Sequence, residues 1–491
     1  MKRKLTILWA IVFTIMLVAC SGSVMSSTGQ TITTEAVSVG TVSQTTSVLS
    51  AQVAAEYDSD DLTVSTDDAG TTTIAFEGDS IQVEGNGASA NGAIVTVTSA
   101  GTYRFSGILD NGQIIVDTVD PDTVVLVLDG IDLTYNAGAP IYVANAEKVV
   151  ITLADGLENT VTDGATYDFP DESDEPDAAI FSHDDLTING NGSLTVNAIY
   201  NNGIASKDDL KIISGTITVN AVNDGIKGRD SVTVKDGEIT INGGEITITQ
   251  SYEGIDSAAI TVNNGTIHLT ASDDGFNAAG GTDGSSIDGR PGQNNFVASG
   301  NYHLYINGGY IFVDAGGDGL DSNGPIDMTG GTVIVNGPTN NGNGPLDYTG
   351  SFNITGGYLL AVGSSGMAQA PSNTSTQYAV MYNFDTMLTA GKMVHIETQA
   401  GEDILTFMPA KEYQSVLLSS SALQNGETYV VYTGGGSTGT AMDGLFSDGD
   451  YTAGTQVTSF TVTGIITGGG MMTGGPGGRP GGSGGLPPAR P

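Results

Sequence analysis

Acidic residues recur in one short motif along the middle of the chain. Each copy is an acid followed by glycine and a large apolar residue, and the acids are Asp224, Glu253, Asp274 and Asp318. Nearby positions add further carboxylates at Asp256, Asp273 and Asp321. Carboxylate oxygens are ligands that Ca²⁺ prefers, and Ca²⁺ takes roughly six to eight oxygens. These acids are therefore the candidate calcium ligands of the chain.

Each acid has a second explanation in turn chemistry. Asp-Gly pairs favour tight turns without any ligand, and a single Asp on a turn usually faces solvent. A row of acids is different, because carboxylates stacked about 5 Å apart repel each other unless a cation lies between them. We therefore expect at least one Ca²⁺ along the row, and leave open which acids hold it.

The motif repeats at the spacing of a stacked β-coil. From Asn202-Gly to a weaker copy at Asn341-Gly, successive copies are 22, 29, 21, 44 and 23 residues apart. The interval of 44 residues is two coils, or one coil with the polar insertion 280–300. Short β-branched runs such as Ile217-Thr-Val-Asn alternate with period two. The pattern predicts an all-β fold, a parallel β-helix with about 22 residues per coil, each coil a turn motif and two short strands. A β-sandwich array is the competing fold, but it would not keep the motif in phase.

The two ends of the chain differ from the repeat in composition. Residues 1–19 join a basic start to an apolar stretch, which predicts a signal peptide, and the small residue before Cys20 predicts a lipidated cysteine. An ordinary signal peptide with an incidental cysteine is the alternative. The further divisions are a Ser/Thr-rich tether at 20–55, the β-helix at 56–371, a C-terminal β-module or cap at 372–467 and a disordered Gly/Pro-rich tail at 468–491. We expect an exported, membrane-anchored lipoprotein on the bacterial cell surface.

The charge of the chain restricts its partners and metals. Asp and Glu number 55 against 15 Lys and Arg, which gives a formal net charge of −40. Nucleic acid is not an expected partner, because its binding needs clustered Lys and Arg. The single cysteine and the four scattered histidines also disfavour zinc and copper.

The few basic residues gather beside the acidic row. Five of them fall within two coils: Lys207, Lys211, Lys227, Arg229 and Lys235. Lys207, Lys227 and Arg229, together with Tyr252, are candidates for binding an acidic sugar polymer next to bound calcium. The alternative is that these cations form structural ion pairs with neighbours such as Asp208, Asp209 and Asp230.

Several long motifs resemble one known family. They are Ala178-Ala-Ile-Phe-Ser-His-Asp-Asp-Leu-Thr-Ile-Asn-Gly, Asn202-Gly-Ile-Ala-Ser-Lys-Asp-Asp-Leu-Lys-Ile and Asp224-Gly-Ile-Lys-Gly-Arg-Asp-Ser-Val. They resemble the bacterial carbohydrate-binding-domain proteins of the clostridial cellulose- and polygalacturonate-binding type, which have a pectate-lyase-like parallel β-helix. The resemblance implies a right-handed β-helix, several calcium ions on acidic turns, and binding to plant cell-wall polysaccharide. Asn202 and Asn341 replace the acid at their positions, so the resemblance implies no calcium ligand there.

Two functions and a structural role remain open at this level. The first is a calcium-binding surface lipoprotein, expected to be a monomer, that binds acidic plant polysaccharide such as polygalacturonate and also cellulose. The second is a calcium-dependent polysaccharide lyase, in which Lys207 or Lys227 would be the general base. The third is an adhesin or spacer without a sugar ligand.

Overall fold

A computed structural model describes residues 57–64, 70–169, 175–228, 238–241, 245–279 and 302–468. They belong to one compact unit that spans 55–491. The predicted signal peptide, Cys20, the whole tether at 20–55, Arg229 and the C-terminal tail beyond 468 lie outside the described residues. Within the described part, α1 (Ser59–Leu62) is the only helix and all other regular secondary structure is β-strand. No helix there is long and apolar enough to cross a membrane.

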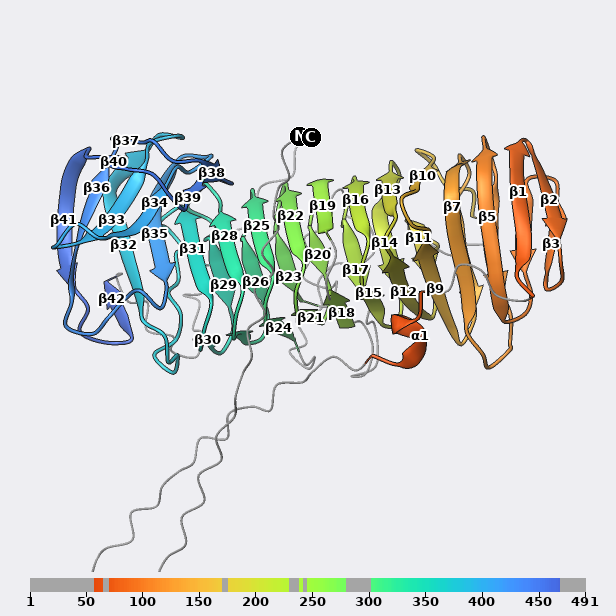
Figure 1. Cartoon of the computed structure of the whole chain (residues 1–491), viewed down its shortest axis with the longest axis horizontal. Coiled ribbons are helices and arrows are strands. Elements are labelled where there is room, and N and C mark those ends of the chain that lie inside the picture. Colours follow the sequence, from red (N-terminus) through yellow and green to blue (C-terminus); the bar gives the residue numbers. More distant parts are fainter. Residues whose placement is uncertain are drawn as a thin grey trace, which may run out of the picture. The chain divides into compact units, whose positions relative to one another are not determined.

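Repeating groups of three strands make up the middle of the chain (Figure 1). The first strands of the groups are β11 (Ala178–Ser182), β14 (Asn202–Ser206), β17 (Ile226–Gly228), β20 (Ile255–Asp256), β23 (Phe276–Ala278), β26 (Leu320–Ser322) and β29 (Leu346–Tyr348). The second strands are β12 (Asp185–Gly190), β15 (Leu210–Ile212), β18 (Glu238–Ile241), β21 (Ala259–Val262), β24 (His303–Ile306), β27 (Ile326–Met328) and β30 (Phe352–Ile354). The third strands are β13 (Ser193–Ala198), β16 (Thr216–Ala221), β19 (Glu245–Gln250), β22 (Thr266–Ala271), β25 (Tyr310–Ala315), β28 (Thr332–Asn336) and β31 (Tyr358–Gly363).

Each of these strands pairs in parallel with its equivalent in the next group. The first strands belong to an 11-stranded sheet, and the second and third strands belong to a 23-stranded sheet. The prediction of a turn motif followed by only two strands was wrong, because the residues that follow each acid-glycine pair form the first strand. The interval of 44 residues is one group with an insertion, since Phe276 pairs directly with Leu320.

The glycine of the motif is explained by close stacking. At Gly254, an added Cβ would lie 2.4 Å from the Gly275 carbonyl oxygen of the next group. The Gly254 N–H donates to the Asp274 carbonyl oxygen at 3.0 Å, so the backbones of neighbouring groups touch at this point. The apolar residue that follows enters the core, where Ile255 and Phe276 are 0% exposed. The motif is therefore kept in phase by packing between groups as well as by turn chemistry.

The N-terminal strands extend the same two sheets. They are β1 (Thr72–Gly78), β2 (Ser80–Glu84), β3 (Ala88–Asn91), β4 (Ile94–Val97), β5 (Gly101–Leu109), β6 (Gln113–Asp117), β7 (Val124–Tyr135), β8 (Ile141–Asn145), β9 (Lys148–Leu153) and β10 (Glu158–Asp163). Most pair in parallel, but β1 pairs with β2, and β3 with β4, in antiparallel fashion. The regular repeat thus begins after two antiparallel pairs.

A largely antiparallel module follows the last group of strands. It contains β32 (Ala379–Leu388), β33 (Val394–Thr398), β34 (Asp403–Phe407), β35 (Tyr413–Ser419), β36 (Thr428–Thr433), β37 (Gly436–Ser437), β38 (Ala441–Met442), β39 (Leu445–Phe446), β40 (Tyr451–Thr452), β41 (Thr455–Thr461) and β42 (Ile466–Gly468). Strand β35 pairs antiparallel with β31, which joins the module to the large sheet. A second core, which includes Ile334, Leu360 and Phe407, fills the space between them.

Candidate cation-binding site

One position of the first strands carries a continuous line of polar residues. Paired neighbours along the 11-stranded sheet are, in order, Lys227, Asp256, Asn277, Asp321 and Asp347. The apolar residue before each one points into the core, so these side chains point to the opposite face of the sheet. We call this line the polar ladder.

A second row of acids runs beside the polar ladder, just before the first strands. These are the acids of the repeated motif: Asp224, Glu253, Asp274 and Asp318. Their backbone carbonyls accept hydrogen bonds from the motif glycines of the preceding groups at 2.9 to 3.0 Å. This bonding fixes the stacking of the row, as the sequence predicted. Two rows of carboxylates therefore meet along one edge of the sheet.

The first acidic cluster already contains a cation from the protein. One oxygen each from Asp224, Glu253 and Asp256 lie within 4.8 Å of one another, and all three residues are buried. The Lys227 Nζ atom is 2.5 Å from Asp224 Oδ2 and 2.7 Å from Asp256 Oδ2. Burial alone would lower the pKa of Lys227, but the three carboxylates hold it well above its usual value of 10.5. An ammonium group therefore lies against two of these three acids, and calcium ligation by the three stays a prediction.

The second acidic cluster consists of Asp318, Asp321 and Asp347. One oxygen from each lies within 4.8 Å of the others, and the side chains are half-buried. Asp318 Oδ1 accepts a hydrogen bond from the Gly344 N–H at 2.6 Å, and Asp274 Oδ1 accepts one from the Asp318 N–H at 2.6 Å. The cluster is therefore continuous with Asp274.

The pKa values around the second cluster show crowding of negative charge. Burial, followed by the neighbouring carboxylates of Asp321, Asp273 and Asp318, raises the pKa of Asp274 to about 9. Burial also raises the pKa of Asp318 to about 6, with help from Asp347 and Asp273 and against the Gly344 N–H. Like charges this close disfavour joint ionisation, and a bound cation would relieve their repulsion. The donors are all carboxylate oxygens, with neither His nor Cys among them, which fits Ca²⁺ better than zinc.

The remaining predicted site residues do not converge on a single point. Asp273 hydrogen bonds with the Tyr252 phenol, and burial together with this bond raises the pKa of Tyr252. Lys207 Nζ is 2.6 Å from Glu175 Oε2, so its ion-pair partner is Glu175 and not the neighbouring acids that the sequence suggested. Arg229 and Cys20 lie outside the described residues.

Asp347 was missed at the level of sequence because the last repeat is out of step. The sequence aligned Asn341-Gly with the motif, whereas the structure pairs Leu320 with Leu346 and Asp321 with Asp347. Pro345 stands where the other groups have the motif glycine. The Leu-Asp pair at 346–347 repeats the Leu-Asp pair at 320–321, and this repetition could have identified Asp347 from the sequence.

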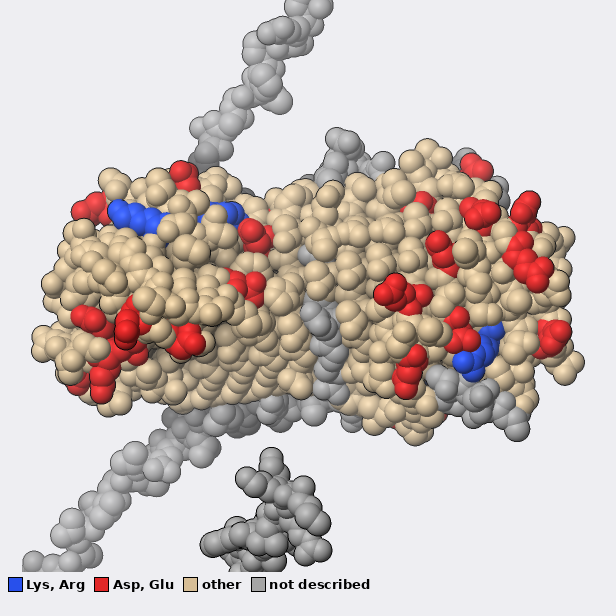
Figure 2. Space-filling model, turned by 45° about the horizontal axis from the view of Figure 1, so that its top comes forward, with Lys and Arg blue, Asp and Glu red and all other residues tan. Residues whose placement is uncertain are grey.

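Acidic side chains are also prominent on the molecular surface. On the face shown in Figure 2, acidic side chains are more frequent than basic ones. Such a surface repels a polyanion, so an acidic ligand requires a bound cation where it makes contact.

A family model of carbohydrate-binding domain-containing proteins matches residues 91–342. The chain belongs to this family. The matched segment contains all seven acids that the sequence proposed as ligands, whereas Asp347 and the C-terminal module lie beyond it.

Two known proteins are similar to this chain. A carbohydrate-binding domain-containing protein of Acetivibrio thermocellus is 49% identical over 150 residues, which is 30% of this chain and 52% of the relative. The chain thus spans about half the length of the curated relative that it matches. The solved structure of a polysaccharide lyase-like protein from C. thermocellum, a gadolinium derivative, is 35% identical with a TM-score of 0.44, and the match covers 58% of this chain and 97% of that one.

Proposed function

We propose that this member of the carbohydrate-binding domain family is a calcium-loaded, right-handed parallel β-helix that binds acidic cell-wall polysaccharide of the polygalacturonate type. In the proposal it is an exported lipoprotein, anchored through Cys20 on the bacterial surface, and it acts as a monomer. Cellulose is a further ligand in this proposal. Family membership and the repeated parallel pairing of the strands support it.

The second acidic cluster is the observation that carries the calcium part of the proposal. Asp318, Asp321 and Asp347 supply three converging oxygens, and Asp274 lies beside them with a raised pKa. Ca²⁺ accepts roughly six to eight oxygen ligands, so an ion held by three carboxylates keeps positions for other oxygens. A uronate carboxylate can fill such a position. Bound calcium would thereby reverse the local charge that otherwise repels an acidic polymer.

The lyase alternative receives no support from the two lysines that were proposed as its base. A general base must have lost its proton, whereas the pKa of Lys227 is raised and its side chain is only 12% exposed between two carboxylates. Lys207 pairs with Glu175. Binding without bond cleavage is therefore the function that the geometry supports best.

The test is retention of the protein on immobilised polygalacturonate, with calcium and with excess EGTA. The wild-type protein is expected to be retained only with calcium, and the Asp321→Asn/Asp347→Asn double variant should lose retention. The matched control is Asp132→Asn/Asp385→Asn, which removes the same charge from two exposed positions and should behave as wild type.

Three results would contradict the proposal. Retention that is unchanged by EGTA and by the cluster variant would remove calcium from the mechanism. No retention under any condition would favour the adhesin or spacer role. Steady release of unsaturated product, followed by ultraviolet absorbance, would show a lyase in place of a binding protein.

A further inference from the structure

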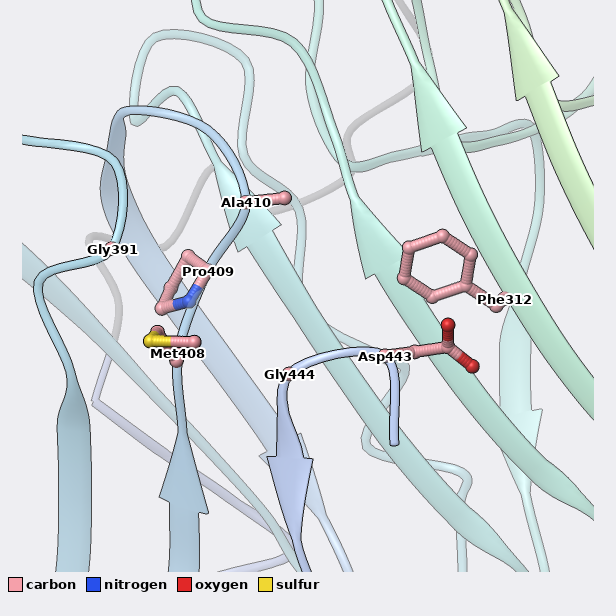
Figure 3. A pocket seen from close by; sticks show the side chains of 7 residues that line it. All are labelled: Phe312, Gly391, Met408, Pro409, Ala410, Asp443 and Gly444. Carbon is pink, nitrogen blue, oxygen red and sulfur yellow. The ribbon is translucent and has the colours of Figure 1, made fainter. Parts of the chain in front are cut away.

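A cavity of about 330 Å³ lies where the third strands meet the C-terminal module (Figure 3). Phe312 of β25 forms one wall, and the module supplies the others through Gly391, Met408, Pro409, Ala410, Asp443 and Gly444. All the module residues lie beyond the segment that the family model matches, and the polar ladder belongs to the other sheet. The cavity is thus separate from the candidate cation-binding site.

Asp443 brings a fixed hydrogen-bond acceptor to this cavity. Its Oδ2 atom accepts a hydrogen bond from the Tyr310 hydroxyl at 2.7 Å and lies 2.9 Å from His268 Nε2. Both contacts use Oδ2, so Oδ1 keeps its capacity to accept. Figure 3 shows the carboxylate beside the Phe312 ring. The carboxylate is therefore oriented by the large sheet although its backbone belongs to the module.

The backbone of Asp443 supports a functional role for this residue. Its φ is 50°, and it is the one non-glycine residue with a positive φ in the described part of the chain. Asp tolerates this region better than most residues, but strained positions persist mainly where the surrounding structure or a function requires them. Glycine would adopt this φ more easily, yet the position carries an aspartate whose carboxylate lies at the cavity.

The cavity also leaves apolar side chains accessible to a ligand. Met408, which lines it, is 40% exposed. Phe312 is half-buried. An aromatic wall with one oriented acceptor matches a pyranose sugar, because such a sugar has an apolar C–H face and hydroxyl groups that donate hydrogen bonds.

We propose that this cavity is a second carbohydrate site, which binds a neutral pyranose unit without calcium. The sugar would lie with its C–H face against Phe312 and Met408, and one of its hydroxyl groups would donate a hydrogen bond to Asp443 Oδ1. A uronate unit is disfavoured, because its carboxylate would face that of Asp443. The volume is at the lower end of the range of roughly 300–1,000 Å³ for ligand sites, which suits one or a few sugar units. This inference extends the proposed function, but it does not depend on calcium.

The test is calorimetric titration of the full chain with a β-1,4-linked glucose hexamer in excess EGTA. The wild-type protein should bind, and Phe312→Ala should bind about tenfold more weakly or worse, as is common when an aromatic anchor is truncated. Asp443→Gly should also lose affinity, and because glycine adopts positive φ readily, it removes the carboxylate without straining the loop. Met408→Ala is a third variant, at a half-exposed position that tolerates truncation.

Met367→Ala is the control, since Met367 is 45% exposed and does not line the cavity. It should bind the hexamer as wild type does. The proposal is overturned if the wild-type protein does not bind the hexamer, or if Asp443→Gly and Met408→Ala both bind it normally. Calcium-dependent retention on polygalacturonate should stay intact in all these variants, so failure of this site is distinguished from failure of the calcium-dependent binding in the proposed function.

Discussion

Lys227 shows how one side chain divides the acidic row into two chemically different parts. It precedes Asp256 in the polar ladder, and its ammonium group lies between Asp224 and Asp256. The cluster formed by Asp318, Asp321 and Asp347 has the same ligand chemistry but lies further along the ladder. A tethered cation thus serves the first cluster, and a calcium ion is proposed for the second.

Replacing Lys227 by methionine should turn the first cluster into a cation-dependent one. The variant keeps most of the side-chain volume but leaves three buried carboxylates without their ammonium group, which should cost about 3–5 kcal/mol of unfolding free energy. Added Ca²⁺ should recover part of this loss, because it binds the folded state only. Urea unfolding with calcium and with EGTA measures both effects.

Lys207→Met is the matched control for this change. Lys207 also forms an ion pair with a carboxylate, but its side chain is 27% exposed, so its loss should cost about 1 kcal/mol or less. Calcium should not rescue it. A Lys227→Met variant that is as stable as wild type in EGTA would contradict the role given to Lys227.

Only part of the acidic row could be predicted from the sequence. The spacing predicted the row of acids, because acids in phase along stacked coils must lie side by side. It did not predict that Lys227 lies inside the row, since the direction of a side chain depends on which face of the short strand it occupies. Asp347 was not predicted, because Pro345 replaces the motif glycine and Asn341-Gly was aligned with the motif in its place.

At the scale of elements, the segment around α1 ties the N-terminal end of the described chain to the large sheet. Asp61 is 0% exposed and pairs with Lys148 of β9 at 2.5 Å and with Lys211 of β15 at 3.2 Å. It also accepts a hydrogen bond from the Thr187 hydroxyl of β12 at 2.6 Å. Burial would raise the pKa of Asp61, but its hydrogen bonds and the nearby lysines keep it lowered. One carboxylate thus joins three adjacent strands.

Asp61→Ala should be among the most destabilising single changes in this region. It leaves Lys148, whose side chain is 8% exposed, with only the exposed Asp58 as its partner, so the cost should approach the value of about 3–5 kcal/mol for a broken buried pair. Its neighbour Asp60 is exposed, so Asp60→Ala should cost about 1 kcal/mol or less. Urea unfolding of the two variants provides the comparison. Equal stability of both would show that the segment contributes little to the fold.

Sequence reasoning about the elements succeeded where the repeat is strict. The β-branched alternation predicted the second and third strands, since every other residue must enter the core. The first strands were taken for turns because β20 and its equivalents are only two to five residues long, and β17, β20, β23 and β26 begin directly after the motif glycine. Nothing in such a short run distinguishes a turn from a strand, and the pairing with the next group decides it.

At the scale of the whole molecule, two hydrophobic cores share the last parallel strands. In β31, Leu359 belongs to the core enclosed by the strand groups, and Leu360 belongs to the core beneath the C-terminal module. In β28, Val333 and Ile334 divide in the same way. Because neighbouring residues of a strand face opposite sides, the two cores lie on opposite faces of the same strands. The module and the final strand groups are therefore expected to unfold together.

A matched pair of neighbouring substitutions tests this coupling. Leu359 and Leu360 are both 0% exposed, so truncation of either to alanine should cost about 2–5 kcal/mol through lost burial and the cavity that remains. If the cores are coupled through β31, both variants should move one calorimetric transition to lower temperature by similar amounts. If the module were an independent unit, Leu360→Ala would instead split off an early transition, while Leu359→Ala would leave that transition in place. A single shared transition is the expected result, because both cores pack against β31. Loss of either core leaves one face of β31 unpacked and weakens its pairing with β35.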